Sequence, residues 1–297
     1  MARLLHEPVM LDEVLEALAL RPGAVVVDAT LGLGGHALAM AERIAPGGVL
    51  VGLDRDARML ETARQRLADV RDVTLQLEHA RFEELSDVMA RLGMQADAML
   101  FDLGLNSAQV GDAARGFSFL EDGPLDMRMD RSAGQPASAL LNRWTPLQIE
   151  QVLREYGDER FSRAVARQVV ERRKTHPLRT TSDLVECVLA AIPPAAREKR
   201  IHPATRTFQA VRIAVNEELE GLGDALESAA FCLWPGGRMA VLSYHSGEDR
   251  ITKNVFRNLA SEGFDAITRK PLTPSEEEIR RNPRSRSAKL RVLRRNA

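Results

Sequence analysis

Short apolar runs and amphipathic stretches alternate along the first hundred residues of the chain. The apolar runs are rich in valine and leucine, which is typical of buried strands, whereas the amphipathic stretches repeat their apolar residues at helical spacing. Strands that alternate with helices through short connections form a parallel sheet, so the pattern predicts an α/β fold. The predicted strands fall at about 24–29, 48–54, 73–79 and 97–103, and the predicted helices at about 8–19, 35–45, 57–68 and 82–92.

This alternation stops after the fourth predicted strand. Residues 104–135 are rich in Gly, Ser, Asp and Met without periodicity, and a loop of that length in a compact protein is usually functional or disordered. The chain then has helical patterns, and strand patterns return only after Pro203. We therefore predict a helical domain at 112–205, inserted into an α/β domain formed by 1–111 and 206–297. The insert's helices are predicted at about 146–156, 160–174 and 182–192, and the later elements are a helix near 206–232 and strands near 238–244, 264–269 and 288–294.

A glycine-rich turn follows the first predicted strand. Asp28 ends that strand, Gly32 and Gly34 follow, and a helix begins directly after them. Glycines let the backbone approach a ligand closely, and a helix N-terminus presents unpaired N–H groups to the same space. Asp54 and Asp102 end the second and fourth strands. Because the carboxyl ends of parallel strands share one edge of a sheet, these features predict a nucleotide-type ligand site there.

The turn formally fits the G-x-G-x-x-A variant of the dinucleotide fingerprint, which leaves a nicotinamide cofactor open. Two acids favour S-adenosylmethionine instead. Asp28 would repel a pyrophosphate but would pair with the ammonium of the methionine part, and Asp54 could accept hydrogen bonds from both ribose hydroxyls. Phe82, which opens the helix after the third strand, could lie against the adenine or could be an ordinary core residue.

Asp102 stands where the chemistry is expected in this architecture. Transfer of a methyl group to an exocyclic amine requires an acceptor for the N–H protons, because the nitrogen lone pair is delocalised into the ring until hydrogen bonding or proton loss frees it. The Asp102 carboxylate is a suitable acceptor, although an aspartate here could instead cap the loop through an Asx turn. His36 stands at the start of a predicted helix, where its backbone N–H would matter more to a ligand than its ring.

Basic residues are segregated along the chain, although the net charge is only −1. Residues 160–212 contain twelve Arg or Lys and four Asp or Glu, and residues 280–297 contain eight basic side chains and no acidic one. A polyanion-binding surface needs such segregation, although solvated helix faces and a basic tail would also produce it. Aromatic residues make up 4% of the chain, so contacts to backbone phosphates would dominate any nucleic-acid binding.

The sequence gives no indication of a membrane protein, since it has no run of eighteen apolar residues. The N-terminus lacks the apolar core of a secretion signal, which favours a cytoplasmic protein. Cys187 and Cys232 lie far apart within apolar helical patterns, so we expect free thiols in a reducing compartment. No Cys or His stands near either of them at the spacing of metal ligands.

Several blocks of sequence occur in a characteristic order from about residue 6 to the C-terminus. They are His6–Leu11, Asp28–His36, Leu53–Asp56, Asp102–Ser107, Arg115–Phe119, Gly123–Asp130, Tyr156–Phe161, His202–Ile213 and Ser243–Arg250. Together they resemble the RsmH (MraW) family of bacterial S-adenosylmethionine-dependent 16S rRNA cytosine-N4 methyltransferases. The resemblance implies a Rossmann-like class I methyltransferase sheet with an inserted helical domain for substrate recognition.

The resemblance also implies roles for individual residues. We further predict that Asp102 orients the amine and that the loop 104–130, together with Asp126, Arg128 and His245, closes over the base, unless these three only hold the loop in place. The target would be a cytosine in the decoding region of the small ribosomal subunit, single-stranded or turned out of its stack. The leaving group is a neutral thioether, so no metal is expected. The implied cofactor-binding residues are Gly34, Gly35, His36, Asp54, Phe82, Asp102 and Gln109.

Two other classes of protein remain open at this stage. An NAD-dependent oxidoreductase would use the same glycine turn, although no acid/base pair for hydride transfer follows it. A non-catalytic rRNA-binding assembly factor would keep the basic surfaces at 160–212 and from Arg280 onward, but it would not need Asp102. The sequence also leaves open whether the chain acts as a monomer or a homodimer.

Overall fold

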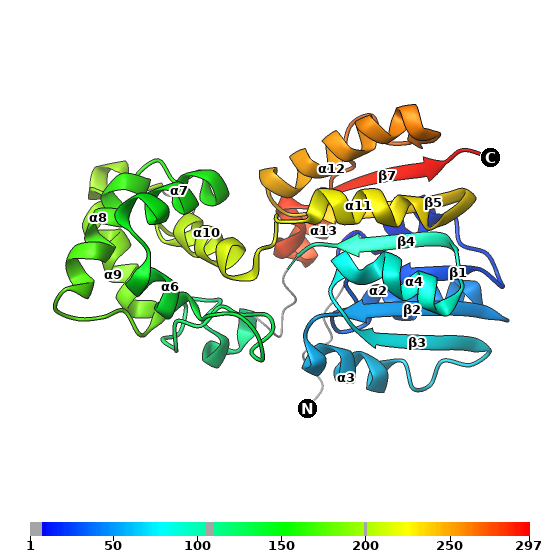
Figure 1. The fold of residues 1–297 in the computed structure, drawn as a ribbon, viewed down its shortest axis with the longest axis horizontal. Coiled ribbons are helices and arrows are strands. Elements are labelled where there is room, and N and C mark those ends of the chain that lie inside the picture. Colours follow the sequence, from blue (N-terminus) through cyan, green and yellow to red (C-terminus); the bar gives the residue numbers. More distant parts are fainter. Residues whose placement is uncertain (1–7, 105–109, 199–200) are drawn as a thin grey trace. The chain divides into compact units, whose positions relative to one another are not determined.

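A computed structural model describes residues 8–104, 110–198 and 201–297 of the chain. The chain divides into two compact units, and each is described by itself. The first unit comprises Met1–Asn106 and Leu219–Ala297, and the second comprises Ser107–Glu218. Figure 1 shows the first unit as a sheet with helices and the second as a group of helices joined by irregular segments.

The first unit is built on one seven-stranded sheet. Its strands are β1 (Val25–Asp28), β2 (Gly48–Asp54), β3 (Val73–His79), β4 (Ala96–Asp102), β5 (Leu233–Ser243), β6 (Phe264–Ala266) and β7 (Lys289–Arg295). They lie in the order β3-β2-β1-β4-β5-β7-β6. Strands β1 to β5 are parallel, whereas β7 pairs antiparallel with both β5 and β6. The α/β class predicted from the alternating pattern is confirmed.

Helices cover both faces of this sheet. They are α1 (Leu11–Leu18), α2 (Gly35–Ile44), α3 (Ala57–Arg66), α4 (Leu85–Leu92), α11 (Leu222–Phe231), α12 (Ser246–Leu259) and the short α13 (Glu276–Arg281). Successive side chains of a strand point to opposite faces. Val26 and Leu100 therefore share a core with residues of α1, α2 and α3, while Val27 and Phe101 share one with residues of α4, α11 and α12. Burial on both faces explains why β1, β2 and most of β4 read as continuous apolar runs.

The second unit is helical. Its helices are α6 (Ala137–Arg143), α7 (Pro146–Gly157), α8 (Ser162–Arg173), α9 (Thr181–Ala191) and α10 (Thr205–Asn216). Helix α7 packs against α8 and α10, and α8 packs against α9. The starts of α7 and α9 are fixed by capping boxes, in which Thr145 pairs with Gln148 and Thr180 with Asp183.

The single helix predicted near 206–232 is in fact two helices that belong to different units. Helix α10 ends at Asn216, where the C-cap residue Glu217 has a left-handed φ of 53°. Helix α11 begins only after Gly221, whose φ is 72°. Because α10 packs against α7, it belongs to the second unit. The predicted end of the insert at residue 205 therefore differs from the structural boundary, which follows Glu218.

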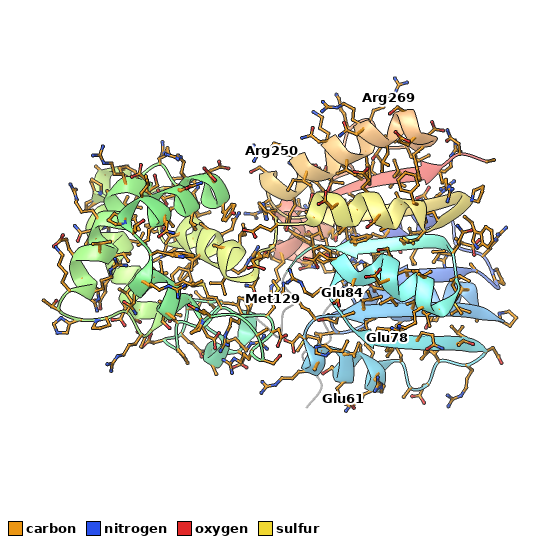
Figure 2. The ribbon with its side chains drawn as sticks, viewed as in Figure 1. Glu61, Glu78, Glu84, Met129, Arg250 and Arg269 are labelled. Carbon is orange, nitrogen blue, oxygen red and sulfur yellow. The ribbon has the colours of Figure 1, made fainter. Side chains whose placement is uncertain are left out.

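Hydrogen bonds hold the aperiodic segment that precedes α6. The buried guanidinium of Arg115 donates to the carbonyl oxygens of Arg128 and Met129 at 3.0 and 2.8 Å. Met129, labelled in Figure 2, donates its N–H to the side-chain oxygen of Asn216 at 2.7 Å. The Asn216 amide in turn donates to the Met127 carbonyl oxygen at 2.7 Å. This part of the loop is therefore tied to α10.

None of the helices in the described ranges is long and apolar enough to cross a membrane. Both cysteines are free, as the sequence predicts, with Cys187 buried and Cys232 half-buried. Burial raises the pKa of the Cys187 thiol to about 11, so this side chain stays protonated at neutral pH and packs as a small apolar group.

Candidate active site

Three acidic side chains lie at one edge of the sheet because their strands are adjacent and parallel. Asp28 ends β1, Asp54 ends β2 and Asp102 ends β4, and β1 pairs with both of the other strands (Figure 1). Asp28 is only 2% exposed. Its burial raises its pKa to about 8, and the charges of Asp102 and Asp54 contribute in the same direction. The structure thus brings the three predicted carboxylates together.

The glycine turn lies between β1 and α2. Gly34 is the residue before α2 and has a φ of 73°, a conformation that residues with a side chain rarely adopt. A Cβ atom at Gly34 would lie 3.3 Å from the Cβ of Ala63, and one at Gly35 would lie 2.8 Å from a side-chain carbon of Pro8. Glycine is therefore strongly favoured at Gly34 by backbone geometry and at Gly35 by packing. The turn keeps backbone rather than side chains at the start of α2.

Asp54 also supports this turn. One carboxylate oxygen accepts the N–H of Gly32 at 2.7 Å, and the other accepts the N–H of Asp56 at 2.7 Å. Burial raises the pKa of Asp54 to about 6, although these two hydrogen bonds act in the opposite direction. Each carboxylate oxygen can accept a further hydrogen bond. Asp54 can therefore hold the turn and still accept hydrogen bonds from two ribose hydroxyls.

The ring of His36 has a larger role than the sequence predicts. The side chain is buried in the first turn of α2, and Nε2 lies 3.0 Å from the Val9 carbonyl oxygen. Nδ1 lies 3.6 Å from one carboxylate oxygen of Asp102. The ring therefore lies between the segment before α1 and Asp102, whereas the sequence predicts that the backbone N–H of His36 matters more than its ring.

Tyr244 is the site residue that the sequence analysis missed. It follows β5, the strand next to β4, and its hydroxyl donates to a carboxylate oxygen of Asp102 at 2.8 Å. Burial, followed by the charge of Asp102, raises the pKa of Tyr244 well above its usual value, so the hydroxyl remains a donor throughout the physiological range. A Cβ atom at Gly104 would lie 2.6 Å from the Tyr244 ring. Gly104 therefore provides the space that this ring occupies.

Asp102 is thus held by contacts on both sides. Its backbone N–H donates to the Thr30 hydroxyl at 2.6 Å. The Tyr244 hydroxyl contacts one carboxylate oxygen, and the His36 ring faces the other. These contacts restrict rotation of the carboxylate, which a residue that orients a substrate amine requires.

We expect Tyr244→Phe to lower kcat for methyl transfer about tenfold while changing the KM for the methyl donor little. The substitution keeps the ring but removes a hydrogen bond to a charged group, which is worth about 1.5–3 kcal/mol. Steady-state kinetics would measure both constants. The chain's other tyrosine, Tyr156 in α7, provides the matched control as Tyr156→Phe. Equal kcat values for the wild type and Tyr244→Phe would contradict the positioning role of the hydroxyl.

Phe82 opens a short 3-10 helix, Phe82–Glu84, that leads into α4. Its ring is half-buried and meets the ring of Phe101 edge to face, with 6.2 Å between the centroids. The structure thus gives Phe82 a core contact, and its part in binding adenine stays a prediction. Gln109, the last residue of the predicted cofactor set, lies outside the described residues.

Asp126 and His245 both contact neighbouring residues of their own segments. The Asp126 carboxylate contacts the Arg128 guanidinium at 2.8 Å and that of Arg131 at 3.4 Å. His245 is the N-cap of α12, where Nδ1 accepts the Gly247 N–H at 3.2 Å. Its Nε2 lies 3.1 Å from the Glu248 carboxylate. These contacts favour the alternative in which both residues are structural. Asp126 would hold the loop, and His245 would fix the start of α12.

Part of the basic C-terminal segment, Lys289–Arg295, forms strand β7, and phosphate binding by the segment from Arg280 onward stays a prediction. Lys289 and Arg291 both pair with Asp249, at 3.1 and 2.7 Å. Arg294 pairs with Asp265 at 2.9 Å. These three basic side chains of β7 therefore neutralise acids of their own unit.

Several basic side chains at the end of α8 also have partners within their unit. Arg172 pairs with both Asp183 and Glu186 of α9. Arg173 donates to the carbonyl oxygens at the end of α6, those of Leu141 and Trp144. Substitution of these arginines would disturb the helical packing, so it would be a poor test of RNA binding.

The residues at the sheet edge fit S-adenosylmethionine. Asp28 is a buried carboxylate that accepts a hydrogen bond from the Thr30 N–H, and no ion pair joins it to a described Lys or Arg. The ammonium group of the ligand would supply the missing cation. Asp54 offers acceptors for the ribose, and the Gly34 turn leaves the backbone accessible. The chain therefore provides a partner for each of these groups.

The strand order, the antiparallel β7 and the acidic strand ends together define a Rossmann-like methyltransferase domain. The chain belongs to the MraW methylase family, whose sequence pattern matches residues 3–296. S-adenosylmethionine, the cofactor predicted from the sequence, is the methyl donor of this class. Membership in this family argues against the NAD-dependent oxidoreductase that the glycine turn alone leaves open.

Curated relatives are similar over nearly their whole length. Ribosomal RNA small subunit methyltransferase H of Pelobacter propionicus is 46% identical over 311 residues, which cover 99% of each chain. The protein of the same name from Symbiobacterium thermophilum is 45% identical over 305 residues, covering 97% of this chain and 96% of the relative. Among solved structures, an rRNA methylase from Streptococcus thermophilus has a TM-score of 0.44 at 14% identity, covering 97% of this chain and 94% of that one.

Proposed function

We propose that this chain transfers a methyl group from S-adenosylmethionine to the exocyclic N4 amine of a cytosine in the decoding region of 16S rRNA, in the small ribosomal subunit of the cytoplasm. The observation that carries the proposal is the Asp102 carboxylate, held between Tyr244 and His36 at the edge where Asp28 and Asp54 also lie. The relatives named for methylation of small-subunit rRNA support this substrate.

Asp102 orients the amine in this mechanism. When bound, S-adenosylmethionine supplies a methyl group on a positively charged sulfur, which departs as a neutral thioether. Asp102 accepts a hydrogen bond from the cytosine amine, which makes the nitrogen lone pair more available for attack. The same carboxylate would take up the proton that the amine releases once the donor has transferred its methyl group.

Positioning is the main contribution of the surrounding residues. Holding two reactants in the correct geometry converts a bimolecular step into an effectively unimolecular one. Tyr244 and His36 hold the Asp102 carboxylate, while Gly34, Gly35 and Asp54 hold the donor. We assign the second unit to the RNA, because residues 160–212 are strongly basic.

We expect the 16S rRNA of cells that lack this chain to lose one methyl group, on a single cytosine. Mass spectrometry of nuclease fragments of 16S rRNA would measure the loss, and a plasmid that carries the wild-type gene should restore the methyl group. A plasmid that carries Asp102→Ala should not restore it, which distinguishes an enzyme from an assembly factor. An unchanged set of cytosine modifications in the deleted strain would contradict the proposed function.

A further inference from the structure

The second unit contains a cavity of about 630 Å³ that is lined by residues of α7, of α8 and of the segment between them. This volume lies within the usual range for ligand sites, about 300–1,000 Å³. The cavity has both apolar and charged walls. The apolar lining residues are Pro146, Phe161, Ala164, Ala166 and Val170, and the charged ones are Glu150, Arg160, Arg163, Arg167 and Glu171.

Two of the arginines lack a protein partner. Arg163 and Arg167 are both exposed, and neither makes an ion pair or a side-chain hydrogen bond within the part of the chain that the structure describes. They are four residues apart on α8, so their side chains lie on the same face of the helix, about 6 Å apart along its axis. Arg172, at the end of the same helix, instead pairs with acids of α9.

The acids in the cavity wall already have cationic partners. Glu150 pairs with Arg154 at 3.8 Å, and Glu171 pairs with Lys174 at 2.7 Å. The acidic charge in the wall is therefore largely balanced by neighbours. The two unpaired guanidinium groups give the cavity a positive potential, which favours an anionic ligand.

We propose that this cavity, which we call the α7–α8 groove, binds the sugar–phosphate backbone of single-stranded RNA. Arg163 and Arg167 contact neighbouring phosphates, and the apolar wall beside Phe161 accommodates a sugar or a base. Arginine suits this role because its planar guanidinium can donate two parallel hydrogen bonds to one phosphate. The inference rests on the proposed function, since it assigns the groove to the rRNA substrate.

The test compares two double variants. Arg163→Gln with Arg167→Gln removes both charges of the groove. The matched control is Lys253→Gln with Arg257→Gln, which removes two exposed cations at the same spacing on α12 of the first unit. Binding of a fluorescein-labelled single-stranded oligouridylate is measured by fluorescence anisotropy over a series of salt concentrations. Thermal denaturation establishes that each variant is folded.

We expect the groove variant to bind the oligonucleotide about tenfold more weakly than the wild type. The slope of the logarithm of the binding constant against the logarithm of the salt concentration should be shallower by about 1.4, because each single-strand phosphate contact contributes about 0.7 to that slope. The control variant should stay within about twofold of the wild type. A groove variant that is folded but keeps the wild-type affinity and salt dependence would overturn the inference, as would an equal loss in the control variant.

Methylation of purified small ribosomal subunits separates this inference from the proposed function. If the wild type methylates the subunits and the groove variant shows a raised KM for them with an unchanged kcat, both proposals are supported. If the wild type methylates them and the variant has normal kinetics and oligonucleotide binding, only the groove is wrong. If the wild type methylates no rRNA while the variant still loses oligonucleotide binding, the groove stands and the proposed function fails.

Discussion

Asp102→Ala should lower kcat for rRNA methylation by about 100-fold or more, because it removes a group that contacts the reacting amine. Loss of one preorganised hydrogen-bonding group at a reacting centre typically costs about 10²–10³ in kcat. The fold should survive, since the carboxylate lies at a strand end, and the Asp102 N–H can still donate to Thr30. Transfer of a radiolabelled methyl group to small ribosomal subunits would measure the effect.

Asp97 offers a matched control at the opposite end of the same strand. The Asp97 carboxylate is also fixed, because it accepts hydrogen bonds from the Arg21 guanidinium at 2.9 Å and from the Val25 N–H at 2.9 Å. Asp97→Asn should leave kcat within about twofold of the wild type, because that end of the sheet is remote from the proposed chemistry. Near-normal turnover by Asp102→Ala would instead favour the assembly-factor alternative.

The second large effect concerns the pH dependence of donor binding. In the ligand-free protein the pKa of Asp28 is about 8, so the side chain is mostly protonated at pH 6. An ammonium group pairs with the ionised form, so ligand affinity should follow ionisation of Asp28. We expect the affinity for S-adenosylmethionine to rise at least tenfold between about pH 6 and pH 8, and isothermal titration calorimetry would measure it.

Asp28→Asn should remove most of this pH dependence, because the amide cannot ionise. Asp69→Asn is the control, since the Asp69 side chain is fully exposed and lies in a loop of the same unit. It should keep the wild-type pH profile. A profile that is the same in Asp28→Asn as in the wild type would show that Asp28 does not meet the ligand's cation.

The same pKa shift makes the stability of the ligand-free protein depend on pH. The pKa of Asp28 is raised from 3.8 to about 8 on folding, so the folded state holds a proton that the unfolded state has lost above about pH 4. This contribution to stability is complete below the unfolded pKa and is lost as the pH rises through the folded pKa. Asp54, with a pKa raised to about 6, acts in the same direction over a lower range. Between about pH 4 and pH 8, the melting temperature of Asp28→Asn should therefore fall less steeply with rising pH than that of the wild type.

The sheet and its acidic edge could be predicted because local pattern determines both. A strand buried on two faces contains a continuous apolar run, and a charged residue directly after the run marks the strand's end, as at Asp28, Asp54 and Asp102. Because parallel strands all end at the same edge of a sheet, these ends could be placed together before the strand order was known. The glycine turn likewise depends on residues that are close in sequence.

Tyr244 could not be found in this way because its contact is not local. Asp102 and Tyr244 are 142 residues apart and meet only because β5 pairs with β4. Helix α12 left a clearer signal that was overlooked, namely apolar residues at helical spacing after Glu248. The break between α10 and α11 was missed because it depends on Glu217, a left-handed residue other than glycine or asparagine.

A crystal structure with bound S-adenosylhomocysteine tests the central claim most directly. The account predicts the ligand at the carboxyl edge of β1, β2 and β4, with its amino group near Asp28, its ribose hydroxyls on Asp54 and its sulfur facing Asp102. A ligand bound elsewhere, or an Asp54 carboxylate directed away from the ribose, would contradict the account.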